Sequence, residues 1–276
     1  MAAPPWQLHQ TAWRDYFIVR PNERPRTFGV IFEENDGSLG RHTPDKTFMS
    51  QMNLDGQSGL GLRCTKFQCV NSVCNVGGHL GNDTFYAGGS KHTLRNSFYY
   101  NQHLLFDEVC SRLGRQVAST FEIDHLGYVK YIGSETLLLP SQVSTPEGPE
   151  DLVDSLAVKL GFQDAATVEQ GGLLCHAVEP HRTAAFLGDM FGPISEVNIF
   201  CESLHIASTE GVLAIIPLLS LPPRAPVHYP MEQSVYRPLN ETGCYNTFVF
   251  EIVDKVFRPV HFLVNRPSIE VLLAHL

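Results

Sequence analysis

The last eighty residues, 196–276, constrain the fold most, because they contain short runs in which apolar and polar residues alternate. Turn-forming residues follow several of these runs. The clearest runs are 197–202, 212–216, 248–253, 260–264 and 269–273. Period-two patterns bounded by turn residues are typical of antiparallel sheets. A chain that ends in this way, with no catalytic motif, is predicted to be a building block rather than an enzyme.

Turn-forming residues are frequent along the whole chain. Its 276 residues include 18 prolines and 22 glycines, which favour short strands over long helices. Hydrophobic residues make up 43% and charged residues 18%, as in a globular protein. We therefore expect a mainly β protein with one large domain, or one domain that carries an inserted subdomain.

The charge and the apolar runs exclude several classes of protein. The formal net charge of −9 argues against a protein that coats DNA with its whole surface. No apolar run is long enough to span a bilayer. The N-terminus lacks the basic and apolar regions of a signal peptide. The seven cysteines are therefore expected to be reduced and mostly buried thiols.

Residues 1–46 are predicted to form an irregular N-terminal arm, because five prolines and polar patches outweigh one short apolar run. Two interpretations stay open: a solvated arm, or an arm that clasps a neighbouring subunit or an acidic inner surface. In the second case the candidate subunit-contact residues are Arg14, Arg20, Arg24 and Arg26. The remaining residues, 47–276, are predicted to form one domain, with inserted regions around 77–101 and 163–192.

The first part of that domain is predicted to form strands. Residues 47–76 indicate a strand, a turn and a second strand, and glycine pairs in 77–101 mark loops between short aromatic strands. The core positions expected in the first of these segments are Leu60, Leu62, Cys64, Phe67, Cys69 and Val73.

Two short helices are predicted in the middle of the chain. Residues 102–118 carry apolar side chains every four residues, and a second helix is expected to follow Pro149 and to end at Gly161. Between them, we expect a hairpin over 121–132, with its turn around Leu126 and Gly127. Residues 141–148 are expected to form a polar connector.

Residues that could carry chemistry do not form a motif. Cys64, Cys69 and Cys74 are spaced by five, whereas zinc knuckles need closer pairs, so we expect no metal site and no cofactor. The sequence contains no nucleophile elbow, P-loop, zinc-protease or dinucleotide fingerprint. A hydrolase would need a pocket that joins Cys110, Cys175 or Cys201 to a histidine and a carboxylate.

Several short patterns follow one another in an order that resembles one family. Their positions are 48–56, 151–162 (ending in Leu-Gly-Phe), 197–204, 211–217, 236–240, 248–254 with 259–262, and 269–273. This order is similar to that of the penton-type capsid proteins of Polinton-like elements, adintoviruses and adomaviruses. The resemblance covers roughly 47–76 and 150–276, and departs from the family at Gln57, Ala214 and Asn265, which indicates a distant relative.

The resemblance implies a jelly roll, an antiparallel sandwich of two sheets. It implies a penton subunit at the vertices of an icosahedral DNA virus or virus-like element. The expected partners are further copies in a homopentamer and the neighbouring major capsid protein, with little or no nucleic-acid contact. The expected location is the virion, assembled in the host cell nucleus. Residues 163–192 and the arm are the expected subunit seams.

One further alternative is a receptor- or carbohydrate-binding sandwich that acts as a spike or a lectin-like module. It predicts an exposed aromatic cluster at one loop end, formed by Tyr86, Tyr99 and Tyr100.

Overall fold

The fold is given by a computed structural model that describes most of the chain. The described residues are 17–19, 26–32, 48–50, 60–201, 204, 211–231, 234–239, 244–245, 248, 250–264 and 267–276. Strands dominate them and nearly all pair antiparallel, which confirms the mainly β, antiparallel fold predicted from the alternating runs. Within these ranges, none of the helices has the length and apolar character needed to cross a membrane.

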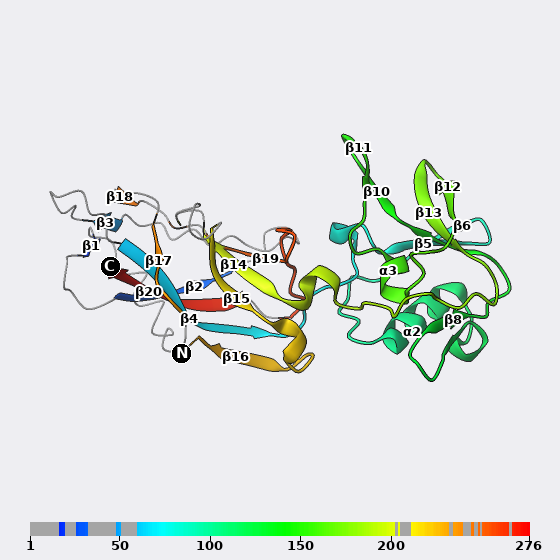
Figure 1. The fold of residues 1–276 in the computed structure, drawn as a ribbon, viewed down its shortest axis with the longest axis horizontal. Coiled ribbons are helices and arrows are strands. Elements are labelled where there is room, and N and C mark those ends of the chain that lie inside the picture. The colour runs from blue at the N-terminus through cyan, green and yellow to red at the C-terminus, as the bar shows by residue number, and fades with distance from the viewer. Residues whose placement is uncertain are drawn as a thin grey trace. The chain divides into compact units, whose positions relative to one another are not determined.

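The chain divides into two compact units (Figure 1). Unit 1 comprises residues 1–72 and 195–276, and unit 2 is the continuous stretch 73–194. The predicted arm and the predicted insertions at 77–101 and 163–192 stay predictions.

The described strands of unit 1 form three sheets. The largest has the order β16-β4-β20-β2, with β17 also beside β4, and the second has the order β15-β14-β19. The third, β1-β3-β18, contains the parallel pair β1 and β3. The elements are β1 Phe17–Val19, β2 Arg26–Ile31, β3 Phe48–Ser50, β4 Leu60–Val70, β14 Val197–Cys201, β15 Val212–Ile216, β16 Pro226–Pro230, β17 Arg237–Pro238, β18 Cys244–Tyr245, β19 Phe250–Val253, β20 Ser268–His275 and the 3-10 turn η4 Leu218–Ser220. The 3-10 turn η3 Gly192–Ser195 contains the sequence boundary between the units.

Strand β4 contains a β-bulge that changes which of its side chains face the core. The register with β20 shifts between Glu270 and Val271 and leaves Thr65 as the extra residue. The buried positions are Leu60, Leu62 and Cys64 before the bulge, and Phe67 and Cys69 after it. These five predicted core positions are confirmed, as is Val73, and the bulge explains why the alternation changes phase.

The second sheet of unit 1 follows the alternation in the sequence. Val197, Ile199 and Cys201 are fully buried. The strand predicted at 260–264 is wrong: Leu263 N–H donates to the Ser72 carbonyl (3.0 Å) and Val264 N–H to the Ser72 hydroxyl (3.1 Å). These irregular bonds replace a strand ladder there.

Unit 2 is built around a five-stranded antiparallel sheet with the order β12-β13-β9-β5-β6. Two separate hairpins, β7–β8 and β10–β11, complete its described strands. The elements are η1 Gly78–Leu80, β5 Thr84–Ala87, β6 Ser90–Thr93, α2 Gln102–Leu113, η2 Val117–Ser119, β7 Phe121–Ile123, β8 Val129–Tyr131, β9 Leu137–Pro140, β10 Gln142–Thr145, β11 Gly148–Asp151, α3 Leu156–Leu160, β12 Thr167–Gln170 and β13 Leu173–Val178.

The predicted hairpins of unit 2 form where the turn residues lie. Gly88 and Gly89 connect β5 to β6 with φ values of 55° and 77°, which glycine adopts most easily. The predicted hairpin over 121–132 is also confirmed. Its turn is held by Asp124, whose carboxylate accepts hydrogen bonds from the N–H groups of Tyr128 and Leu126, and these bonds lower its pKa.

The two predicted helices exist, with different bounds. α2 ends at Gly114 rather than at residue 118, because Gly114 takes the left-handed conformation. α3 ends at Gly161 as predicted, but it starts at Leu156, where Ser155 is the N-cap. The residues after Pro149 pair in β11 instead, so the predicted connector 141–148 is wrong and forms most of the β10–β11 hairpin.

The core of unit 2 is a single apolar cluster rich in aromatic rings. Phe106 of α2 stacks on Phe121 with ring centroids 4.5 Å apart, and Tyr131 lies 5.5 Å beyond. The Tyr131 hydroxyl donates to the Glu135 carbonyl (2.7 Å), and burial raises its pKa. Each fully buried ring contributes roughly 1.5–3 kcal/mol to folding.

Candidate functional site

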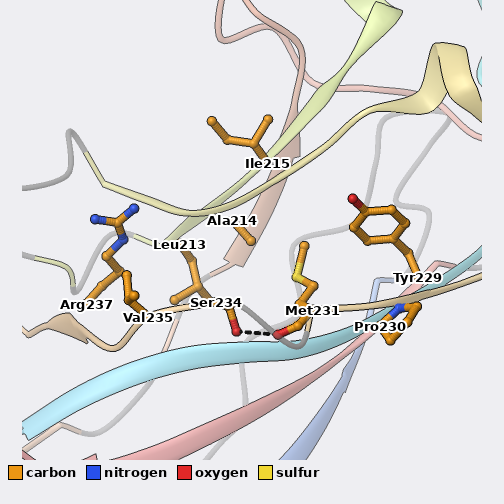
Figure 2. A pocket seen from close by; sticks show the side chains of 9 residues that line it. All are labelled: Leu213, Ala214, Ile215, Tyr229, Pro230, Met231, Ser234, Val235 and Arg237. Atoms are coloured by element: carbon orange, nitrogen blue, oxygen red, sulfur yellow. Dashed lines mark hydrogen bonds between the residues drawn. The ribbon is translucent and has the colours of Figure 1, made fainter.

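A pocket of about 580 Å³ lies in unit 1 between strand β15 and the segment that runs from β16 to β17 (Figure 2). The described part of its lining is mainly apolar and contains a single charged side chain, that of Arg237. The lining residues are Leu213, Ala214, Ile215, Tyr229, Pro230, Met231, Ser234, Val235 and Arg237. In Figure 2, Tyr229 and Arg237 stand at opposite ends of the pocket. Such a volume and lining are in the range of ligand-binding pockets.

The bulge in β4 produces one wall of this pocket. β16 pairs with residues 66–70 of β4 and β17 with residues 61–62, so the chain leaves the ladder beside the bulge. The connecting segment instead forms hydrogen bonds with the backbone carbonyls at the bulge. Met231 N–H donates to the Thr65 carbonyl (2.9 Å), and the Ser234 hydroxyl donates to the Cys64 carbonyl. Its residues Met231, Ser234 and Val235 then face the pocket.

Strand pairing sets the direction of the two polar ends. Arg237 is directly opposite Leu62, and Tyr229 is opposite Phe67. Directly opposed residues project to the same face, so both polar side chains share the face of two fully buried residues. The buried Nε of Arg237 has no hydrogen-bond partner among the described residues. Leaving such a donor unpaired costs on the order of 1–3 kcal/mol, which favours a ligand that carries an acceptor.

The strands on the two sides of the pocket differ in how their outer edges are protected. β16 and β17 contain Pro226, Pro230 and Pro238, which lack N–H groups and block further pairing. β15 has the sequence Val-Leu-Ala-Ile-Ile, without proline or charge. Ile215, its fourth residue, exposes 55% of its surface.

Unit 2 holds a second unusual site, a fully buried ion pair. Lys159 Nζ lies 2.7 Å from Asp154 Oδ1, and both side chains are inaccessible to solvent. The same ammonium donates to the Met190 carbonyl (3.2 Å). Desolvating two charges is costly unless further hydrogen bonds accompany the pair.

Two buried asparagines extend this polar cluster. Asn82 donates to the carbonyls of Asp154 (2.9 Å) and Asn75 (3.0 Å), and Asn75 donates to those of Tyr99 (2.8 Å) and Met190 (2.7 Å). The network connects segments far apart in the sequence, which fits a structural role. It was not predicted, because nothing in the sequence marks Lys159 as buried.

The buried thiols are poorly suited to nucleophilic chemistry. Burial raises the pKa of Cys64 and of Cys69 to about 12 and that of Cys74 to about 11. It also raises the pKa of Cys110 and of Cys175, two of the three nucleophiles considered for a hydrolase. A reactive cysteine needs the opposite shift, which argues against that alternative. Among the described residues, no group of three or more His, Cys, Asp or Glu side chains could hold a metal ion.

The structure places the other candidate residues as follows. Arg14, Arg20 and Arg24 lie outside the described residues, and Arg26 begins β2, opposite Leu273, with its side chain outside the description. The aromatic cluster expected of a receptor-binding module does not form at 86, 99 and 100, because Tyr99 is buried and donates to the Arg95 carbonyl (3.2 Å).

Comparisons with known proteins give matches in structure only. No family model and no curated protein match the sequence. The crystal structure of the mavirus penton protein is similar with 11% sequence identity and a TM-score of 0.38, covering 94% of this chain and 97% of that chain. A chain of the Sputnik virophage structure solved by cryo-electron microscopy is similar with 9% identity and a TM-score of 0.36, covering 92% and 98%. At these values neither similarity carries an argument about this chain.

Proposed function

We propose that this protein is a structural virion protein, a penton-type subunit that forms a homopentameric ring at the vertices of an icosahedral capsid. The observation that carries the proposal is the order of its elements. Strands β4, β14, β15, β19 and β20 occur on the segments that resemble the penton family, and α3 ends in the Leu-Gly-Phe motif at 160–162.

The architecture of unit 1 supports this role. The two antiparallel sheets β16-β4-β20-β2 and β15-β14-β19 contain most of its described strands, and β15 of the second sheet approaches β4 of the first without pairing with it. We propose that they form the jelly roll implied by the resemblance. A stiff sandwich of this kind leaves loops and edges free to contact neighbours.

The segment 163–192 supports the proposed seams between subunits. It exposes four large apolar side chains, each with 39–58% of its surface accessible: Val168, Leu174, Phe186 and Leu187. Burying apolar surface between subunits stabilises an assembly by about 25 cal/mol per Å². We propose that part of this surface is covered by a neighbouring subunit and that the arm with its four arginines makes further contacts.

Native mass spectrometry of the purified full-length chain tests the proposal. A species of about five times the 30.8 kDa chain mass is expected. A trimer would favour a spike, and a monomer at every concentration would contradict self-assembly. Electron micrographs of particles that contain the chain should place it at the five-fold vertices, and fluorescence microscopy of infected cells tests the proposed nuclear assembly.

A further inference from the structure

Strand β15 offers an open edge on which another strand can pair. Within the described part of the chain, β15 pairs with β14 alone, and no proline, charge or covering ladder blocks its other side. The outward N–H and C=O groups of such a strand are a template for β-augmentation. The pocket lies along this edge, so an added strand would enter it.

The pocket also selects the charge of the added strand. Among the described residues, Arg237 is the only charged one that lines the pocket, and its buried Nε has no hydrogen-bond partner there. The remaining lining is apolar apart from Ser234 and the Tyr229 hydroxyl. The complementary strand therefore carries a carboxylate beside apolar side chains.

An edge strand of unit 2 has that composition. β12 (Thr-Val-Glu-Gln) forms an edge of the unit 2 sheet, and its described partner is β13. Its Glu169 is exposed, directly opposes Leu174 and follows Val168, and these two apolar residues are 42% and 39% exposed. Among the described ion pairs, none involves Glu169.

Other described edges fit less well. β7 (Phe-Glu-Ile) carries Glu122, which already lies 3.6 Å from Lys130, and β19 (Phe-Glu-Ile-Val) belongs to the same sheet as β15. β6, at the opposite side of the same sheet, carries Lys91, which would repel Arg237. β11 is acidic, but Pro149 removes an N–H group from its ladder. β12 contains no proline. Its four residues span about 13 Å, within the roughly 17 Å of β15.

We propose that β12 of a second copy of this chain adds to the edge of β15, with its Glu169 carboxylate paired to Arg237 in the pocket. The proposal rests on the proposed function, because it identifies one contact by which copies assemble. The contact joins two different patches, so the first copy keeps a free β12 and the second a free β15 for further neighbours. Such a head-to-tail contact closes into a ring or continues as an open chain.

Charge reversal at the two residues tests the contact in the full-length protein. Sedimentation velocity over a range of concentrations would compare the wild type with Arg237→Glu, Glu169→Arg and the double variant R237E/E169R. Each single variant is expected to raise the dissociation constant on the order of a hundredfold, and the double variant to recover most of that loss.

Arg63→Glu is the matched control. Arg63 is also an arginine of the β4 sheet with an unpartnered buried Nε among the described residues, but it lies against the Tyr236 ring (5.2 Å) and does not line the pocket. Its reversal should leave association unchanged. Recovery in the double variant would show that neither substitution in itself prevents folding or association, and circular dichroism checks the fold of each single variant.

The outcomes separate this contact from the capsid role. Wild-type rings that tolerate both single reversals would overturn the contact and leave the capsid role standing. Open chains of the wild type that dissociate on either reversal and re-form in the double variant would support the contact and contradict the five-subunit ring. Equal loss of association in R63E would also overturn the contact, since a general charge effect would then explain the result.

Discussion

The two units are both mainly β, yet they are assembled from the chain in opposite ways. In unit 2, four strand pairs are hairpins between consecutive strands, and the whole unit is one continuous stretch. In unit 1, the longest strand, β4, pairs with β20, about 200 residues later. Local pairs close short loops, whereas distant pairs require both ends of the chain. We therefore expect unit 2 to unfold and refold more independently than unit 1.

The units also differ in how they bury charge. In unit 1, the buried carboxylate of Asp254 pairs with Arg258 (2.8 Å), which lies four residues away and retains 28% of its side-chain exposure. In unit 2, both Asp154 and Lys159 are fully enclosed. The Asp254–Arg258 pair can form within a single turn of the chain, whereas the Asp154–Lys159 pair is enclosed only when the rest of unit 2 has folded around it.

The largest expected effect comes from breaking the enclosed pair. Lys159→Ala leaves Asp154 without its cation and is expected to destabilise unit 2 by roughly 3–5 kcal/mol. Hydrogen exchange read by mass spectrometry should show faster exchange over 73–194 and little change in β4 and β20. Lys130→Ala is the control, because its contact with Glu122 is exposed and should contribute less than about 1 kcal/mol. Equal loss of protection in both units would show that they unfold together.

A pair of glycines in unit 2 gives the next effect. Gly161 and Gly114 both end helices in the left-handed conformation, with φ of 82° and 64°. A Cβ at Gly161 would meet the Phe186 carbonyl oxygen, whereas one at Gly114 meets nothing within 4 Å. Gly114→Ala should cost about 1 kcal/mol and Gly161→Ala about 2–3 kcal/mol. Urea denaturation measures both, and equal costs would contradict the close approach.

The buried thiols of unit 1 should make it sensitive to alkali. The folded-state pKa of Cys64 is about 12, above the ordinary 9.0, so folding favours the neutral thiol. Stability from this group is fully present below about pH 9 and falls as the pH rises toward 12. At pH 10 the loss is on the order of 1 kcal/mol. Cys64→Ala should reduce the difference between the urea midpoints at pH 8 and pH 10. The same difference in the variant and the wild type would show that Cys64 is not the cause of the sensitivity to alkali.

The smallest effect concerns the bulge that shapes the pocket. Ser234→Ala removes a donor to the Cys64 carbonyl and should destabilise unit 1 by about 1 kcal/mol. Ser119→Ala, at an exposed hydrogen bond in unit 2, is the control and should stay within about 0.5 kcal/mol. Thermal denaturation resolves the difference, and equal shifts would show that Ser234 does not support the bulge.

The sequence predicts those elements whose signals are local. Alternation locates β14, and the glycine pair at 88–89 locates the β5–β6 turn. The predicted start of α3 is wrong, because the acidic residues at 150–151 have the composition of a helix N-terminus but do not form one. The side chain of Ser155 caps the helix instead, through the N–H of Val158 (3.4 Å), while 148–151 pairs as a strand.

The candidate sites depend on partners that sequence patterns do not specify. The burial of Lys159 needs the Met190 carbonyl, 31 residues later. The pocket needs the bulge at Thr65, which exists only in the register between β4 and β20. An alternating pattern predicts neither an extra residue nor the distant segment that covers it.

The long separation between β4 and β20 has a consequence during synthesis on the ribosome. At roughly 5–20 residues per second, the polypeptide emerging from the exit tunnel carries β4 for about 10–40 seconds before β20 is translated. For most of that interval the apolar side chains of β4 have none of these partner strands, because β16 and β17 are also translated late. We therefore expect nascent-chain chaperones and the early folding of 73–194 to limit the aggregation of the growing chain.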